Sequence, residues 1–116
     1  MTTNQPIRMT DDEIGALAES FRITKTTPRP KNVGGTWVDG TMGGHRFQAL
    51  VFESHADDPG YELGDSRISK LWLLRIADKT VAANFDRGWD VEPTTDDARA
   101  IVDLLASALA EMVFNA

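Results

Sequence analysis

The sequence contains no cysteine, and this absence excludes several kinds of chemistry at once. Without a thiol the chain forms no disulfide, no thiolate nucleophile and no cysteine-ligated zinc or iron–sulfur site. The sequence also has no run that approaches the roughly 18 consecutive apolar residues of a membrane-spanning helix. Its polar first segment, residues 1–10, lacks the apolar region of a secretory signal. We therefore expect a cytoplasmic protein with no membrane partner and with a flexible N-terminus over residues 1–10.

Sequence patterns of known catalytic sites are missing as well. The chain has no nucleophile elbow, no phosphate-binding P-loop, no zinc-protease helix motif and no dinucleotide-binding fingerprint. It has two histidines, His45 and His55, and no cysteine accompanies them. We expect both to be ordinary surface histidines. The sequence thus predicts neither a cofactor nor a metal, and it favours a binding protein over an enzyme.

Acidic residues outnumber basic ones by 18 to 12, which gives a net charge of −6. Binding to a phosphate backbone depends on a surplus of Lys and Arg, so this balance predicts no direct nucleic-acid partner. The charge is unevenly placed, with a basic run over residues 22–31 and an acidic run over residues 53–65. The acidic run lacks the order of a calcium-binding EF-hand loop and is predicted to be solvated. Its Asp57, Asp58 and Glu62 are candidate binding residues.

The chain has the size and composition of one folded domain, with 116 residues of which 41% are hydrophobic. A capping-box pattern before residue 14 predicts a helix over residues 11–21, and a cluster of Thr and Asp after Pro93 predicts another over residues 95–114. The second has apolar residues at helical spacing along one side. Two prolines and a Gly-Gly pair make residues 22–35 a connecting arm.

Four segments have the alternation and β-branched content of strands, and glycines or polar residues separate them. We therefore predict an α+β fold, in which a four-stranded antiparallel β-meander is covered by the C-terminal helix and accompanied by a short N-terminal helix. Residues 11–116 would form this single domain. The expected strands are residues 36–41, 45–53, 67–76 and 80–85.

Alternation along the third strand places Ile68, Lys70, Trp72 and Leu74 on one face and Ser69, Leu71, Leu73 and Arg75 on the other. The C-terminal helix would cover one of these sets and leave the other partly exposed. If Lys70 and Trp72 lie on the exposed face, they form with Arg67 a surface of the residue types that often dominate protein interfaces. These three residues are predicted to bind a partner.

The segment after the fourth strand concentrates polar and aromatic residues, among them Asp86, Arg87, Trp89 and Asp90. Two acids near an arginine and a tryptophan are typical of a ligand pocket or of a paired-carboxylate acid/base site. The structural interpretation is a turn in which Gly88 has a positive φ and Trp89 packs on the edge of the sheet. We favour the structural interpretation, because large aromatic residues near turns usually fill a core.

Two motifs indicate a family. The motifs Arg67-Ile68-Ser69-Lys70-Leu71-Trp72 and Asn84-Phe85-Asp86-Arg87-Gly88-Trp89-Asp90 make the chain similar, over about residues 36–110, to an uncharacterised family of small proteins encoded in bacterial, phage and plasmid genomes. In that family the first motif usually follows Gly-Gly, where this chain has Asp65-Ser66. The second usually has Tyr, where this chain has Phe85. The resemblance implies a mobile-element context and no particular activity.

These observations together predict a small non-enzymatic binding protein whose partner is a protein or a nucleoprotein complex. The narrower hypothesis is an inhibitor of a host nucleic-acid-targeting complex, similar in role to anti-CRISPR proteins, because an acidic surface can occupy a positively charged channel made for nucleic acid. Two alternatives stay open. One is a small enzyme that uses Asp86 and Asp90, and the other is a structural or regulatory accessory protein that dimerises through its sheet or its long helix.

Overall fold

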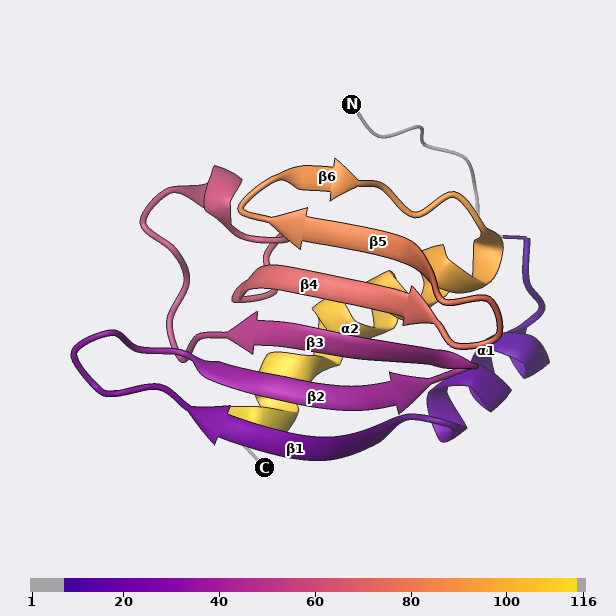
Figure 1. Cartoon of the computed structure of the whole chain (residues 1–116), viewed down its shortest axis with the longest axis horizontal. Helices are drawn as coiled ribbons and strands as arrows, with labels where there is room; N and C mark the ends of the chain where they lie inside the picture. Colours follow the sequence, from indigo (N-terminus) through magenta and orange to yellow (C-terminus); the bar gives the residue numbers. More distant parts are fainter. Residues whose placement is uncertain (1–7, 115–116) are drawn as a thin grey trace.

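The computed structural model describes residues 8–114 and consists of one antiparallel sheet with both helices on the same side (Figure 1). Most of the N-terminal segment that was expected to be flexible, residues 1–7, lies outside the described residues. No helix within the described part of the chain is long and apolar enough to cross a membrane. The elements in chain order are α1 (Asp11–Glu19), β1 (Arg22–Pro28), β2 (Thr36–Met42), β3 (His45–Val51), the short 3-10 helix η1 (Pro59–Tyr61), β4 (Ile68–Arg75), β5 (Thr80–Asp86), β6 (Trp89–Val91) and α2 (Asp96–Phe114).

The strands follow one another across the sheet in the order β1-β2-β3-β4-β5-β6. The antiparallel meander and the α+β class are confirmed, but the sheet has six strands where the sequence predicted four. The predicted connecting arm, residues 22–35, contains β1, which is an edge strand with every residue exposed. It therefore lacks the alternating burial that identifies a strand. Pro28 is tolerated because it ends this strand, where it breaks no ladder in the sheet interior.

Local signals at the helix ends are as the sequence predicts. The Thr10 hydroxyl accepts a hydrogen bond from the Glu13 amide at 3.1 Å, and the Glu13 carboxylate accepts one from the Thr10 amide at 2.9 Å. This capping box satisfies amides that the first helical turn leaves free. At the start of α2 the Thr95 hydroxyl accepts from the Ala98 amide at 3.3 Å. The predicted helices are thus confirmed, although α1 ends at Glu19, two residues early.

The hydrophobic core lies between the sheet and the two helices, and α2 crosses behind the strands in Figure 1. Phe21, just after α1, stacks on Phe47 of β3 with ring centroids 5.9 Å apart. We call the helix-bearing side of the sheet the covered face. Its fully buried core residues include Val38, Phe47, Leu71, Leu73, Ile101, Leu105 and Leu109.

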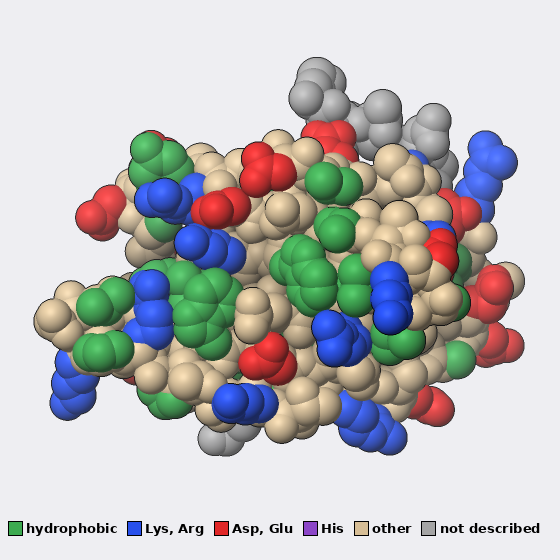
Figure 2. All heavy atoms as spheres, in the orientation of Figure 1, with side chains coloured by type: hydrophobic (Ala, Val, Ile, Leu, Met, Phe, Trp, Pro, Cys, Tyr) green, Lys and Arg blue, Asp and Glu red, His purple; other side chains and the backbone are tan. Residues whose placement is uncertain are grey.

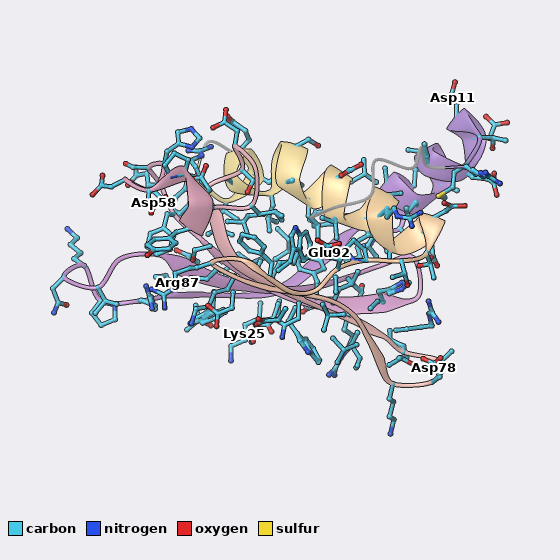
Figure 3. The ribbon with its side chains drawn as sticks, turned by 90° about the horizontal axis from the view of Figure 1, so that it is seen from above. Asp11, Lys25, Asp58, Asp78, Arg87 and Glu92 are labelled. Carbon is cyan, nitrogen blue, oxygen red and sulfur yellow. The ribbon has the colours of Figure 1, made fainter. Side chains whose placement is uncertain are left out.

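The opposite side of the sheet carries no helix among the described residues, and we call it the open face. Figure 3 shows α2 on one side of the strands and Lys25 pointing away on the other. Strand register assigns the remaining members, because directly paired residues share a face. The open face comprises Lys25, Trp37, Asp39, Thr41, Arg46, Gln48, Leu50, Lys70, Trp72, Leu74, Val81, Asn84 and Asp86.

A register shift in β4 corrects the predicted faces of that strand. Leu50 pairs with Lys70 and Val51 pairs with Ile68, so Ser69 is an extra residue opposite β3. Such a bulge reverses the alternation on one side of it. Ile68 is therefore fully buried on the covered face, and its predicted place beside Lys70 is wrong. Lys70, Trp72 and Leu74 share the open face, as the alternation predicts.

Candidate binding site

A cleft of about 790 Å³ lies at one end of the open face. Its walls come from the β1–β2 loop, the segment after β3, the η1 helix, the β4 bulge and the β5–β6 turn, and Phe114 at the end of α2 also lines it. This volume falls within the range of small-ligand sites in proteins. Figure 2, which looks onto this side of the molecule, shows Lys and Arg side chains set among hydrophobic ones. The cations that line the cleft are Arg29, Lys31, Lys70 and Arg87, and its aromatic rings include Phe52 and Tyr61.

The β4 bulge and the β5–β6 turn are tied together at the cleft. The Ser69 carbonyl accepts a hydrogen bond from the Arg87 amide at 2.9 Å, and the Gly88 carbonyl accepts one from the Asp86 amide at 2.9 Å. Arg87 has a φ of +54°, a left-handed conformation that costs a residue with a side chain on the order of 1 kcal/mol. The turn therefore holds Arg87 at the cleft in a backbone conformation that the residue itself disfavours. Such strained conformations are common at binding sites.

Three arginines of this surface lie over aromatic rings. The pairs are Arg29 over Phe52 at 5.7 Å, Arg46 over Trp72 at 6.0 Å and Arg87 over Tyr61 at 5.7 Å, each measured from the guanidinium carbon to the ring centroid. A stacked guanidinium keeps N–H donors at its edge, in a geometry that suits carboxylate and phosphate oxygens. The rings thus orient the arginines and leave donors for a bound anion.

Few carboxylates neutralise these cations. Lys70 and Arg87 share Asp86, at 3.8 Å in each case. Arg29 donates through Nε to the Gly34 carbonyl at 2.6 Å. Within residues 8–114 no carboxylate oxygen lies within 4.0 Å of the charged groups of Arg29, Lys31 or Arg46. The cleft includes the carboxylates of Glu53 and Asp57 in its lining, so its four cations exceed its acids.

The acidic loop is less exposed than the sequence suggested. The Glu62 side chain is 5% exposed, and its carboxylate accepts from His55 Nδ1 and from the Ala56 amide, both at 2.9 Å. Burial raises the pKa of Glu62, but these hydrogen bonds outweigh burial and bring the pKa below its ordinary value. Asp58 accepts from the Gly60 amide at 2.9 Å and caps η1. Of the three predicted loop residues, Asp57 is the one that lines the cleft.

One group of side chains has the donor types of a metal site. The ligand atoms of His55, Glu62 and Asp65 lie within 4.8 Å of one another. The His55 to Glu62 hydrogen bond already partners both groups, and the Arg67 side chain lines the same hollow, where its charge opposes a cation. We interpret the group as a set of contacts that stabilises the loop between β3 and β4. His45 is 2% exposed on the covered face, which corrects its prediction as a surface residue, whereas His55 is exposed as predicted.

The remaining predicted residues do not line the cleft. Arg67 donates to the Glu53 carbonyl at 2.9 Å and approaches Glu111 of α2 at 3.5 Å, so it fastens the loop to the helix. Trp89 packs edge-on against Phe85 at 5.2 Å and contacts the core. The structural interpretation of Trp89 is thus confirmed. Asp86 and Asp90 are exposed, and neither lines the cleft. The structure brings Asp57, Lys70 and Arg87 together, with Trp72 farther along the open face.

Sequence reasoning missed several residues of the site. Arg29 and Lys31 belong to the basic run of residues 22–31, which the sequence predicts to be part of a connecting arm. Phe52 directly follows β3, and Tyr61 is the one tyrosine of the chain. No local pattern links these residues, because they come from segments that only the strand pairing brings together. The unequal split of charge between residues 22–31 and 53–65 was the signal that could have identified the site.

The fold and the cleft define a small α+β protein with an open antiparallel sheet face and a cation-rich cleft at one end of it. The chain belongs to the family described as domain of unknown function DUF7678, whose model matches residues 36–110. This range begins at β2 and contains Phe52, Tyr61, Lys70 and Arg87, whereas Arg29 and Lys31 precede it. Searches of the curated proteins and of the solved structures find no match. The family description names no activity, so the functional argument rests on the site.

Proposed function

We propose that this protein is a non-enzymatic binding protein that holds an anionic partner against its open face and its cleft. The observation that carries the proposal is the gathering of cations and aromatic rings on this surface in a chain whose net charge is −6. A random distribution of charge would make this surface acidic. The gathered cations instead create a local positive field, which attracts and orients an anionic partner.

Acidic residues on the helix side do not cancel this field. The first turn of α1 carries Asp11, Asp12 and Glu13, and that of α2 carries Asp96 and Asp97. These groups lie beyond the sheet from the open face. Exposed charges are screened over about 8 Å at physiological ionic strength. A partner in contact with the open face therefore meets mainly the cations of that face.

The aromatic part of the open face adds to the proposal. Trp37 and Trp72 are half-buried, and Leu50 is 2% exposed although it points away from the helices. Trp and Arg are the residue types that most often dominate binding energy at interfaces. The open face combines both types, so it can bury apolar surface and pair with charge in the same contact.

The competing hypotheses have less support. An acid/base enzyme would need Asp86 and Asp90 to face a substrate, yet Asp86 interacts with Lys70 and Arg87 and neither acid lines the cleft. If the acidic loop imitated nucleic acid, its carboxylates would have to face a partner, but Glu62 is buried. The mobile-element origin, the nucleoprotein target, the anti-CRISPR-like inhibition, the cytoplasmic location and dimerisation as an accessory protein stay predictions.

Affinity capture with charge-matched variants tests the proposal. The open-face variant is Arg46→Gln with Arg87→Gln. Its control is Arg8→Gln with Lys79→Gln, which removes the same charge from exposed positions outside the open face and the cleft. A third bait, Asp58→Asn with Asp65→Asn, tests the acidic loop at exposed positions that do not line the cleft. Each tagged protein is incubated with a lysate of the organism that encodes it, and the bound chains and nucleic acids are identified.

We expect the original protein, the control and the loop variant to retain the same partner, and the open-face variant to lose most of it. Equal thermal stability of all four proteins shows that folding is not the cause. Loss of the partner from the loop variant alone would instead favour nucleic-acid imitation. Retention of the partner by the open-face variant would contradict the proposal.

A further inference from the structure

We infer that the cleft binds single-stranded nucleic acid, with phosphates held by its cations and bases stacked on its aromatic rings. The inference rests on the proposed function, because it names the anionic partner of the open face. Non-specific single-strand binding combines a positively charged groove with aromatic side chains on which successive bases stack. The cleft has both features, in a volume of about 790 Å³ that admits part of a strand.

The phosphate-binding part of the cleft comes from three separate segments. Arg29 and Lys31 project from the β1–β2 loop, Lys70 lies at the β4 bulge and Arg87 lies at the β5–β6 turn. Cations on different walls can contact successive phosphates of one strand. Lys31 forms no carboxylate ion pair within the described residues. The single acid Asp86, which Lys70 and Arg87 share at 3.8 Å, leaves N–H donors on both.

The stacking part of the cleft consists of Tyr61 and Phe52. Tyr61 is 51% exposed. Its ring lies under Arg87, and that of Phe52 lies under Arg29. The side of the Tyr61 ring that Arg87 does not cover can stack on an unstacked base, whereas the paired bases of a duplex cannot enter the cleft. The geometry therefore selects a single strand.

The open face extends this site beyond the cleft. Register places Leu50 next to Lys70 at the cleft end, and Gln48 next to Trp72 in the middle of the face. The Arg46 guanidinium lies over Trp72 at 6.0 Å. A strand that leaves the cleft along the sheet would thus meet a second stacked ring and cation. It would also meet the Gln48 amide, which donates to the Asp39 carboxylate at 3.1 Å and has a further donor and an acceptor for base edges.

An acidic peptide fits the same cations less well. Glu53 and Asp57 line the cleft beside them and repel a ligand that offers mainly carboxylates. A nucleic acid carries amino groups on its bases, and protein carboxylates accept hydrogen bonds from such groups. The two acids therefore repel both kinds of ligand, but only a nucleic-acid strand also offers them hydrogen-bond donors. The net charge of −6 opposes both ligands equally at long range. The inference therefore reverses the sequence prediction of no direct nucleic-acid partner, because the cations of the cleft are gathered in one place.

Fluorescence anisotropy with labelled oligonucleotides tests the inference on the full chain. The probes are a mixed-sequence single-stranded DNA of about 12 nucleotides, a length within the site sizes of single-strand binders, the RNA of the same sequence, the corresponding DNA duplex and a polyglutamate peptide. Three variants accompany the original protein, namely Arg87→Gln, Tyr61→Leu and Lys79→Gln. Lys79 is exposed in the β4–β5 turn, outside the cleft, and gives the same change of charge as Arg87→Gln.

We expect the original protein to bind a single-stranded probe more tightly than the duplex and the peptide. Arg87→Gln should weaken this binding and reduce its salt dependence by about one counterion. Tyr61→Leu should weaken it by about fivefold or more, as the loss of one stacked base does. Lys79→Gln should bind as the original does. Comparison of the DNA and RNA probes identifies which strand is preferred.

The inference is overturned if neither single-stranded probe binds, if the duplex or the peptide binds more tightly, or if Arg87→Gln and Lys79→Gln behave alike. Circular dichroism confirms that each variant is folded. The proposed function fails separately, when a captured partner is insensitive to the open-face substitutions. Capture of an acidic protein that depends on Arg46 and Arg87, without oligonucleotide binding, would retain the proposed function and contradict the single-strand site.

Discussion

The covered face and the open face belong to the same strands and differ in almost every side chain. Along β3 the buried Phe47 and Ala49 alternate with the exposed Arg46 and Gln48. Because successive side chains point to opposite faces, one strand contributes to two different surfaces. The covered face stabilises the fold through apolar burial, whereas the open face has charges and aromatic rings that the fold does not require. This difference indicates that substitutions on the two faces act on different properties, namely on stability and on binding.

The largest expected effect compares two neighbours on β3. Phe47 is 2% exposed in the core, so Phe47→Ala should lower the free energy of unfolding by about 3–5 kcal/mol. Arg46 lies on the open face, and Arg46→Ala should cost about 1 kcal/mol or less, the value of its contact with Trp72. Urea unfolding of both variants gives the comparison. Equal losses at the two positions would show that the open face also supports the fold.

The long helix permits the same comparison within one element. Leu105 is 1% exposed, and Leu105→Ala should lower the free energy of unfolding by about 2–5 kcal/mol. Met112 is 44% exposed, so Met112→Ala should change stability by about 0.5 kcal/mol or less. Denaturant unfolding measures both. A loss below about 1 kcal/mol for Leu105→Ala would mean that α2 does not turn Leu105 toward the sheet.

A smaller effect separates the two roles of the acidic loop. Glu62→Ala removes a buried acceptor and leaves the Ala56 amide without its partner, which should cost about 1–3 kcal/mol at neutral pH. Asp57→Ala, in the cleft, should change stability by about 0.5 kcal/mol or less. Thermal or urea unfolding distinguishes them. A neutral effect of Glu62→Ala would contradict its role in fastening the loop.

The stability difference between the original protein and Glu62→Ala should depend on pH, because the pKa of Glu62 is lowered in the folded state. A carboxylate with a depressed pKa in the folded state stabilises the fold at pH values above its unfolded pKa, here 4.5, and this contribution is lost as the pH falls through the folded value. The gap in stability between the original protein and Glu62→Ala should therefore narrow below pH 4.5. A constant gap down to pH 2 would contradict the ionised hydrogen-bonded carboxylate.

The smallest expected effect concerns the boundary between β1 and its loop. Lys25 lies in the paired strand β1, whereas Lys31 lies in the exposed β1–β2 loop. Because proteases need an extended, unpaired segment, trypsin should cut after Lys31 before it cuts after Lys25. Mass spectrometry of an early digest measures the order. Early cleavage at Lys25 would mean that β1 opens readily, as the connecting arm predicted from the sequence would.

Much of the fold could be predicted because its signals are local. The capping box at Thr10, the Thr and Asp residues before α2 and the Gly43-Gly44 turn each act through neighbouring residues. β1 has no buried face to give an alternating pattern, and β6 has three residues, so both were missed. The cleft depends on strand order and on a bulge at Ser69, which no short pattern encodes. The sequence could therefore indicate some of the lining residues individually, but it could not predict that they lie together in one cleft.

Backbone amide chemical shifts, followed by NMR while the single-stranded oligonucleotide is added, test most directly the claim that the open face and the cleft form the binding surface. We predict that the largest shifts occur at Lys70, Trp72 and Arg87 and at Gly35, which also lines the cleft. Amides on the solvent side of α2 should hardly change. The same titration with Arg87→Gln should give smaller shifts at equal concentration. Shifts confined to α1 and α2, with none around the cleft, would contradict the claim.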